Sequence, residues 1–357
     1  MPTCPLIADP ARYRPCIQNL LTDGEEVREY WLKLFEAHLE TLADLPMPGD
    51  GLLSDRPDWD RFAADYLAGL AELRRDPARR GKLTVLELTI FREEQFAAHG
   101  FPDPFAELKR RENELALQSL GGVLRDIDAT PPARRLEKLI RGLFAGNLFD
   151  MGSKAAVDAF GEGTFDFLAA RDNIGPRHWP VDDLDAWQAR LESAKPPYRQ
   201  ALVFVDNCGP DVVLGVLPLA RYLTGLGARV VLAANTQPAL NDVTATELRA
   251  LLATCARLDA RLREYIWTHQ ITVVESGCAA PLIDLTDLSP ECCDAAATSD
   301  LLILEGMGRA IESNYDARFT VDTVKLALIK DRMVASVLGV SLFDPIFRFD
   351  PAAPMPH

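Results

Sequence analysis

The first half of the chain has the hydrophobic pattern of amphipathic helices. Apolar residues recur at spacings of three and four, the period of one helical face. Three segments share this spacing: residues 26–42, 59–74 and 85–98. Asp103 can cap a fourth helix, with Pro104 in its first turn, where no amide donor is needed. A fifth helix is expected at about 132–144. The pattern therefore predicts a largely helical first half.

The second half changes to short apolar runs of the kind that form buried strands. Five runs share this character: residues 201–205, 228–235, 270–276, 300–305 and 339–347. Longer segments with helical character accompany them at 212–226, 244–269 and 321–338. Strands that alternate with crossover helices predict an α/β fold with a doubly wound, mostly parallel, Rossmann-like sheet.

Four prolines between residues 176 and 197 mark the change from one pattern to the other. Proline clusters interrupt regular structure, so they indicate a boundary between two parts of the chain. We expect an N-terminal helical subdomain, residues 1–198, that contributes to the pocket. Residues 199–357 would then form the α/β metal-binding catalytic domain.

The charge balance narrows the range of partners. The 357 residues include 53 Asp plus Glu against 38 Lys plus Arg, a formal net charge of -15. Such a chain repels polyphosphates, which argues against nucleic acid and against anionic membranes as partners. No long apolar run and no secretory leader are visible, and seven scattered cysteines contain no C-x-x-C pair. These features predict a cytoplasmic protein with free thiols.

Polar side chains follow several of the predicted strands, where α/β folds bind their ligands. Asp206 and Asn207 follow the first run, and the loop after the second run contains Asn235, Asn241 and Asp242. Carboxylate and amide oxygens suit a hard cation such as Mg²⁺ or Mn²⁺. The alternative is that Asp206 and Asp242 cap the helices that follow them. The set as a whole favours a metal site over capping.

A third polar cluster, Glu305-Gly306-Met307-Gly308-Arg309, begins at the last residue of the run at 300–305. Glycines allow backbone amides to approach an anion, and arginine can hold a phosphate at two points. The segment is a poor dinucleotide fingerprint, because Ile311 stands at the third glycine position. A plain strand-to-helix turn explains it equally well. Lys330, expected on the helix at 321–338, is a weaker candidate for contact with the substrate.

Several longer segments resemble the metal-dependent damage-control phosphatases, a former domain of unknown function. The matching segments are FVDNCGPDVVLGVLPLARYL, NTQPALNDVT, LILEGMGRAIESNY, FPDPFAELKRRENELAL and FAGNLFDMGSKAA. The closest similarity is to the branch related to the C-terminal domain of the fourth pantothenate kinase.

The resemblance implies roles for individual residues. It implies that Asp206, Asn207 and Asp242 ligate a divalent metal: Mg, Mn, Co or Ni. It also places Asn147 and Asp150 in the lining of the pocket. The substrate would lie near the third cluster, with Glu305 and Arg309 beside it.

The implied activity is a metal-dependent phosphatase that acts on a small phosphorylated metabolite. The expected substrate is 4′-phosphopantetheine or its oxidised derivatives. Three alternatives remain: a sugar-phosphate phosphatase, an S-adenosylmethionine-dependent carboxyl methyltransferase and a catalytically silent metabolite-binding module. The oligomeric state is open, with a homodimer as one option.

Overall fold

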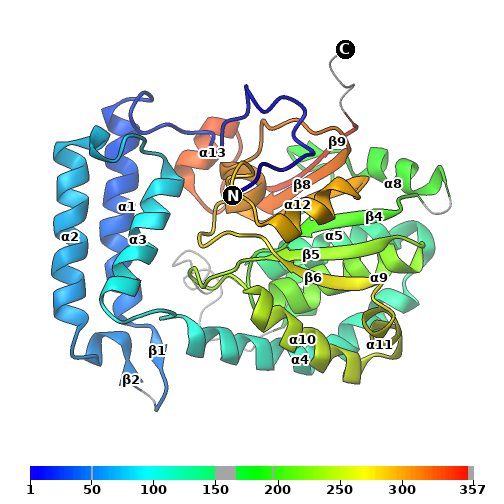
Figure 1. The fold of residues 1–357 in the computed structure, drawn as a ribbon. Coiled ribbons are helices and arrows are strands. Elements are labelled where there is room, and N and C mark those ends of the chain that lie inside the picture. Colours follow the sequence, from blue (N-terminus) through cyan, green and yellow to red (C-terminus); the bar gives the residue numbers. More distant parts are fainter. Residues whose placement is uncertain (50, 149–165, 195–196, 353–357) are drawn as a thin grey trace.

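The computed structural model describes residues 1–49, 51–148, 166–194 and 197–352. Its first half begins with three helices that stand beside the α/β part of the molecule (Figure 1). They are α1 (Glu25–Ala43), α2 (Trp59–Arg75) and α3 (Val85–Ala98). A short β-hairpin, β1 (Pro46–Met47) and β2 (Gly51–Leu52), lies between α1 and α2. The predicted helices are confirmed, because each buries the apolar face that its spacing indicated.

A seven-stranded sheet forms the centre of the α/β part, in the order β3-β9-β8-β7-β4-β5-β6. The strands are β3 (Val181–Asp182), β4 (Gln200–Phe204), β5 (Arg229–Ala234), β6 (Ile271–Glu275), β7 (Leu301–Glu305), β8 (Asp322–Leu328) and β9 (Pro345–Asp350). The pairing of β8 with β9 is antiparallel, and every other described pairing in the sheet is parallel. The predicted mostly parallel α/β fold is thus confirmed.

Helices cover both faces of the sheet. On one face Val203 and Leu232 pack in a single hydrophobic cluster with residues of α4, α5, α9 and α10. On the other face Phe204 and Val231 share a cluster with residues of α12 and of the N-terminal segment. Figure 1 shows α4 and α10 on one side of the sheet and α12 on the other. The bounds are α4 (Ala106–Ala129), α5 (Pro132–Leu148), α7 (Phe167–Asn173), α8 (Leu184–Glu192), α9 (Leu217–Gly225), α10 (Ala245–Leu258), α11 (Ala260–Trp267) and α12 (Pro290–Ala297).

The segment 321–338, predicted as one helix, is instead strand β8 followed by the short helix α13 (Arg332–Leu338). All seven residues of β8 are buried, so the segment lacks the alternation that identifies a half-exposed strand. Lys325 made the strand harder to recognise, because a charged residue is not expected inside a buried strand. Its buried Nζ donates to the carbonyl oxygens of Tyr315 and Ala317. The last strand also begins later than predicted, at Pro345.

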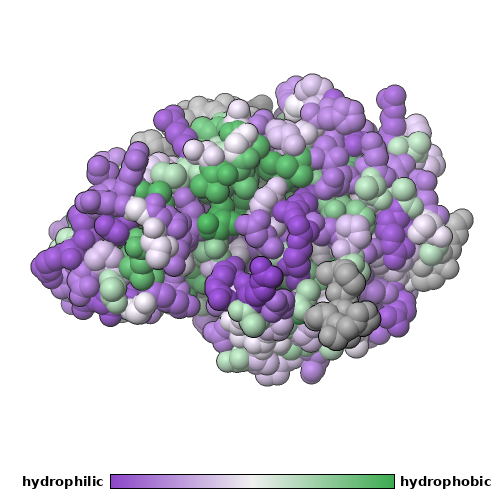
Figure 2. Space-filling view, turned by 90° about the horizontal axis from the view of Figure 1, so that it is seen from above, coloured by the Kyte–Doolittle hydropathy of each residue, from purple (hydrophilic) through white to green (hydrophobic). Residues whose placement is uncertain are grey.

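Contacts between the two halves of the sequence are extensive. The N–H of Cys4 donates to the carbonyl oxygen of Leu285 at 2.8 Å, and the N–H of Ile17 donates to the backbone carbonyl oxygen of Glu312 at 2.8 Å. On the face seen from above, hydrophobic residues gather between the helices and the α/β part (Figure 2). The division at residue 198 stays a prediction, since β3, α4 and α5 precede it and yet pair with or cover the sheet. Among the described helices, none combines the length and the apolar character that crossing a bilayer requires.

Candidate metal centre and active site

The candidate site lies where the order of the strands reverses. The chain runs outward from β4 through β5 to β6 and then returns to β7, on the other side of β4. In such a sheet the crevice at the carboxyl ends of the strands on either side of this point is the usual ligand site. Asp206 lies two residues beyond the end of β4, and Glu305 is the last residue of β7. The structure therefore brings two of the three polar clusters to one crevice, and Asp242 joins them from the loop after β5.

Arg309 connects Asp206 with Asp242. One terminal nitrogen, Nη1, forms an ion pair with Asp206, and Nη2 lies 2.7 Å from Oδ2 of Asp242. Nη2 also donates to Oδ1 of Asn235 at 3.0 Å. The Arg309 side chain is 2% exposed. Burial alone would lower its pKa, but the charges of Asp242 and Asp206 outweigh burial and raise the pKa above its usual value.

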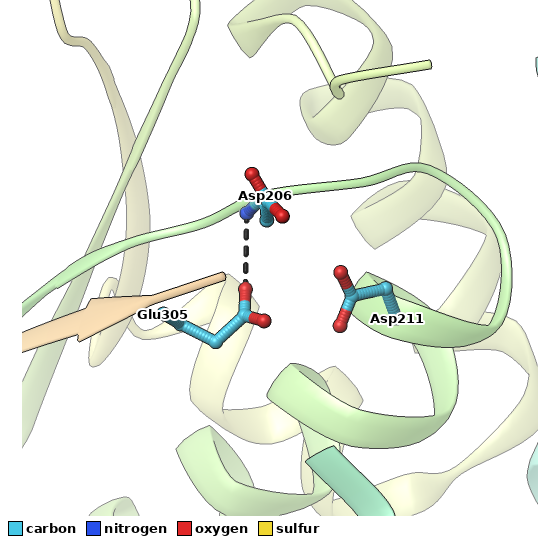
Figure 3. A group of neighbouring side chains, drawn as sticks. All are labelled: Asp206, Asp211 and Glu305. Atoms are coloured by element: carbon cyan, nitrogen blue, oxygen red, sulfur yellow. Dashed lines mark hydrogen bonds between the residues drawn. The ribbon is translucent and has the colours of Figure 1, made fainter. Parts of the chain in front are cut away.

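Asp206, Asp211 and Glu305 form a buried acidic cluster (Figure 3). Each offers one carboxylate oxygen, and the three oxygens lie within 4.8 Å of one another. Asp211 opens a π-helical turn, Asp211–Val216, that leads into α9. The backbone N–H of Asp206 donates to Oε2 of Glu305 at 3.1 Å. Sequence reasoning missed Asp211 as a site residue, although a second acid shortly after Asp206 was a signal for it.

Asn207 links two of these carboxylates. Its Nδ2 donates to Oδ2 of Asp206 at 2.9 Å and to Oδ2 of Asp211 at 3.0 Å. Its backbone N–H donates to the same oxygen of Asp211 at 3.1 Å. Charged hydrogen bonds of this kind hold a carboxylate in a fixed orientation. Asn207 therefore fixes both acids relative to the end of β4.

The donor set fits a hard divalent cation. Burial raises the pKa values of Asp211 and Glu305, and so does the charge of the neighbouring carboxylates, Asp206 among them. A divalent ion would relieve this repulsion. Oδ1 of Asp211 and Oδ1 of Asn147 are buried and receive no hydrogen bond from the described residues. Carboxylate and amide oxygens with unused lone pairs are the ligands that Mg²⁺ and Mn²⁺ prefer.

Gly306 is needed for the close approach of β7 to Asp206. Its φ is +93°, and a Cβ atom there would lie 2.2 Å from Oδ2 of Asp206. A Cβ atom at Gly308 would lie 2.5 Å from the carbonyl oxygen of Pro281. The sequence suggested that these glycines admit an anion. In the structure, the glycines bring the Glu305–Arg309 segment against Asp206 and the loop containing Pro281.

The other predicted site residues surround this centre. Nδ2 of Asn147, in the last turn of α5, donates to Oδ2 of Asp206 at 3.3 Å. Nδ2 of Asn235 donates to Oδ2 of Asp242 at 2.9 Å, and the carbonyl oxygen of Asn241 accepts from the N–H of Cys208. Lys330 lies in the loop after β8, where Nζ donates to the carbonyl oxygen of Asn147 at 3.0 Å. Asp150 lies outside the described residues.

The alternative from the sequence was that Asp206 and Asp242 cap the helices that follow them, but another residue caps α10. Thr244 occupies the N-cap of that helix, and its Oγ1 accepts from the N–H of Glu247 at 3.2 Å. The turn in front of α9 begins at Asp211, with Pro210 at its N-cap. Asp206 and Asp242 thus point their carboxylates toward Arg309. This arrangement supports their assignment to the site.

A cavity of about 500 Å³ opens beside these residues. Its inner end is lined by Asp206, Asn207, Asn241 and Asp242. Residues of α1 and α3 line it as well. Its size falls in the range of about 300–1,000 Å³ that is typical of small-molecule sites.

Glu312 lies in this cavity and gives a first testable prediction. Its pKa is raised from 4.5 to about 8 by burial and by the charges of Asp331 and Asp206, which together outweigh Lys330. Above pH 4.5 the unfolded state loses a proton that the folded state keeps until about pH 8. The free energy of unfolding of the metal-free protein should therefore fall across this interval, by about 1.4 kcal/mol for each unit of pKa shift.

The Glu312→Gln variant should lose this component of the pH dependence. Urea unfolding of wild type and variant between pH 5 and pH 8, with chelator present, measures the difference. The same slope in both proteins would contradict a protonated Glu312.

The chain is similar to several known proteins. The family model described as damage-control phosphatase ARMT1-like domain matches residues 42–346. A damage-control phosphatase from Arabidopsis thaliana is 39% identical over 293 residues, which cover 82% of this chain and 79% of that protein. Pantothenate kinase 2 from the same plant is 39% identical over 97% of this chain and 41% of its own length.

A 4′-phosphopantetheine phosphatase from Mus musculus is 33% identical over 97% of this chain and 48% of its own length. The chain thus spans less than half the length of this protein and of the plant pantothenate kinase. Among solved structures, a DUF89 family protein from Pyrococcus horikoshii superposes with a TM-score of 0.63 at 16% identity. The alignment covers 90% of this chain and 97% of that one, which shows a shared fold.

Proposed function

The chain belongs to the damage-control phosphatase ARMT1-like domain family, and from this premise we propose that it is a metal-dependent phosphatase that hydrolyses phosphate monoesters of small metabolites. The observation that carries the proposal is the buried cluster of Asp206, Asp211 and Glu305 at the switch point of the sheet. Asp206 of this cluster also lines, together with Asn207 and Asp242, a cavity large enough for a metabolite.

Asp206, Asn207 and Asp242 would hold the metal, with Asp211 and Glu305 completing the acidic surroundings. A bound divalent ion supplies Lewis-acid polarisation of the phosphoryl oxygens and an activated water. The residues of the chain position these ligands. Asn207 fixes Asp206 and Asp211, and Arg309 fixes Asp206 and Asp242.

Lys330 is proposed to face the substrate phosphate. It lines the cavity, and Asn147 holds its Nζ through a backbone carbonyl at 3.0 Å. Asn147 in turn donates to Asp206, so the cation is connected to the metal ligands through one residue. An ammonium group there would offset the negative charge that a phosphate brings to an acidic site. The carboxylates would thus hold the metal, and the ammonium group of Lys330 would supply a positive charge near the phosphate.

The proposed substrate is 4′-phosphopantetheine or an oxidised derivative, by analogy with the mouse relative of that name. A cytoplasmic role in coenzyme A metabolism would follow from it. Sugar phosphates are the second candidates. The methyltransferase alternative has less support, because Asp206 lies directly against Gly306 in the loop that would hold the cofactor.

Removal of metal tests the proposal. Phosphate release from 4′-phosphopantetheine is expected to fall below about one tenth after treatment with EDTA, because the carboxylates alone cannot polarise a phosphoryl oxygen. Addition of Mg²⁺, Mn²⁺, Co²⁺ or Ni²⁺ should restore it. A panel that includes glucose 6-phosphate and fructose 6-phosphate separates the two substrate classes. Full turnover after exhaustive chelation, with circular dichroism showing a folded protein, would exclude the metal mechanism.

A further inference from the structure

The cavity beside the acidic cluster has two unlike sides. One part of its lining, around Asp206 and Asp242, contributes carboxylates and amides, whereas a second side is mainly apolar. We call this second side the apolar wall and define it by the residues Trp31, Leu34, Phe35, Leu240, Leu282 and Met307. Its members come from α1 and from loops after β5, β6 and β7. Ring and alkyl carbons of the wall therefore share one space with the candidate metal ligands.

This wall is held in place by hydrogen bonds. Oη of Tyr30, on α1, donates to Oδ2 of Asp331 at 2.7 Å, and Asp331 itself lines the cavity. Nε1 of Trp31 donates to Oε1 of Gln18 at 2.8 Å. These bonds join α1 to the loop in front of α13 and to the N-terminal segment. The position of α1, which carries Trp31, Leu34 and Phe35, is therefore set before any ligand binds, and this lowers the entropic cost of binding.

Leu34 is the member of the wall that is least covered by protein. It is 41% exposed although it lines the cavity. An apolar side chain that faces open space gains from contact with the carbon atoms of a ligand. A phosphate group alone would fill only a small part of a cavity of about 500 Å³. The rest of the cavity, which Leu34 and its neighbours line, is left for the other part of a ligand.

The polar groups that α1 and α3 contribute to the lining are His38, Thr41, Thr89 and Arg92, and the last two are already engaged within the protein. Nη2 of Arg92 lies 3.0 Å from Oε1 of Glu93, and its guanidinium lies over the ring of Phe35 at 5.4 Å. Thr89 donates its hydroxyl to the carbonyl oxygen of Leu86 at 2.8 Å. A ligand with hydroxyls along its whole length would lose hydrogen bonds to water here without replacing them.

We infer that the apolar wall is a subsite for the organic arm of the substrate, and that it selects phosphate esters with an extended, weakly polar arm over polyhydroxylated sugar phosphates. The inference rests on the proposed phosphatase function, because the phosphate defines the inner end of the cavity. It adds to that function a set of residues, with Leu34 foremost, that determine specificity without contact with the metal.

The variant Leu34→Gln tests the subsite, and Leu67→Gln is its matched control. Leu67 lies on α2, is 40% exposed and does not line this cavity. Leu34→Gln is expected to raise KM for 4′-phosphopantetheine by about fivefold with kcat nearly unchanged. Its KM for p-nitrophenyl phosphate, which lacks a long arm, should change less than twofold. Leu67→Gln should match wild type on both esters.

Binding of pantetheine, which carries no phosphate, separates the subsite from catalysis. Isothermal titration should show saturable binding to wild type and to Leu67→Gln, and at least fivefold weaker binding to Leu34→Gln. If no ester is hydrolysed but this pattern holds, the phosphatase proposal fails and the subsite stands. Equal kinetics of Leu34→Gln and wild type on both esters, or an equal loss on both, would overturn the subsite. So would pantetheine binding that is absent or insensitive to Leu34.

Discussion

Replacement of Asp206 or Asp242 by alanine is expected to lower kcat by at least about 100-fold. Both carboxylates are buried, at 6% and 1% exposure, and both face the guanidinium of Arg309 at the inner end of the cavity. Loss of a charged ligand weakens metal binding and removes charge stabilisation from the transition state. Release of phosphate from 4′-phosphopantetheine at saturating Mn²⁺ measures the effect.

Asp322→Ala is the control for this experiment. Asp322 is also buried, at 7% exposure, and accepts hydrogen bonds from Arg190 at 2.7 Å and from Tyr198 at 2.9 Å. It begins β8 and pairs with the first residue of β7, whereas the site lies at the carboxyl ends of the strands. This variant should lose stability but keep its kcat per folded molecule. Near-wild-type turnover of folded Asp206→Ala or Asp242→Ala would remove that residue from the metal site.

The sequence predicted the elements whose burial has a simple pattern. Helices α1 to α3 show the period of one apolar face, and strands β4 to β7 are short apolar runs bounded by polar loops. Strand β8 was misread because burial on both faces removes any period and because Lys325 is a cation inside it. The hydrogen bonds that satisfy Lys325 come from backbone carbonyls, which no side-chain pattern reveals.

The candidate site was predictable to the extent that the topology of parallel strands fixes it. Asp206, Asp242 and Glu305 could be placed together because each lies at or beyond the carboxyl end of a strand, and the carboxyl ends of parallel strands lie on the same side of the sheet. Asp211 was missed, because its inward orientation depends on the π-helical turn that it opens. The partners of Arg309 could not be predicted from the sequence either. An arginine in a strand-end loop can bind a phosphate or a carboxylate, and only the packing of the loop decides between them.

Substitution of Arg309 is expected to have a large effect on stability and on metal binding, because Arg309 orients Asp206 and Asp242. The hypothesis from the sequence was that it holds the substrate phosphate. In the structure its two terminal nitrogens bind Asp206, Asp242 and Asn235. Arg309→Met should therefore destabilise the metal-free protein by about 3–5 kcal/mol, because it removes the cation between two buried carboxylates. Urea unfolding measures this loss.

Arg309→Lys distinguishes orientation of the ligands from a grip on the phosphate. An ammonium keeps the charge, but it cannot span two carboxylates with a planar fork. If Arg309 orients the ligands, the Kd for Mn²⁺, measured by titration without substrate, should rise about tenfold or more, and kcat should fall equally for 4′-phosphopantetheine and p-nitrophenyl phosphate. An unchanged Kd for Mn²⁺ with a higher KM for both esters would instead assign Arg309 to the phosphate.

Arg221→Met is the matched control for both measurements. Arg221 is 7% exposed and binds Asp128 at 2.8 Å and Asp259 at 3.1 Å, so it is also a buried arginine between two acids. It lies on α9 and does not line the cavity. Its loss should lower stability without any change in the affinity for Mn²⁺. A metal affinity that falls equally in both variants would show that general loosening of the fold, and not the contacts of Arg309 with Asp206 and Asp242, controls the site.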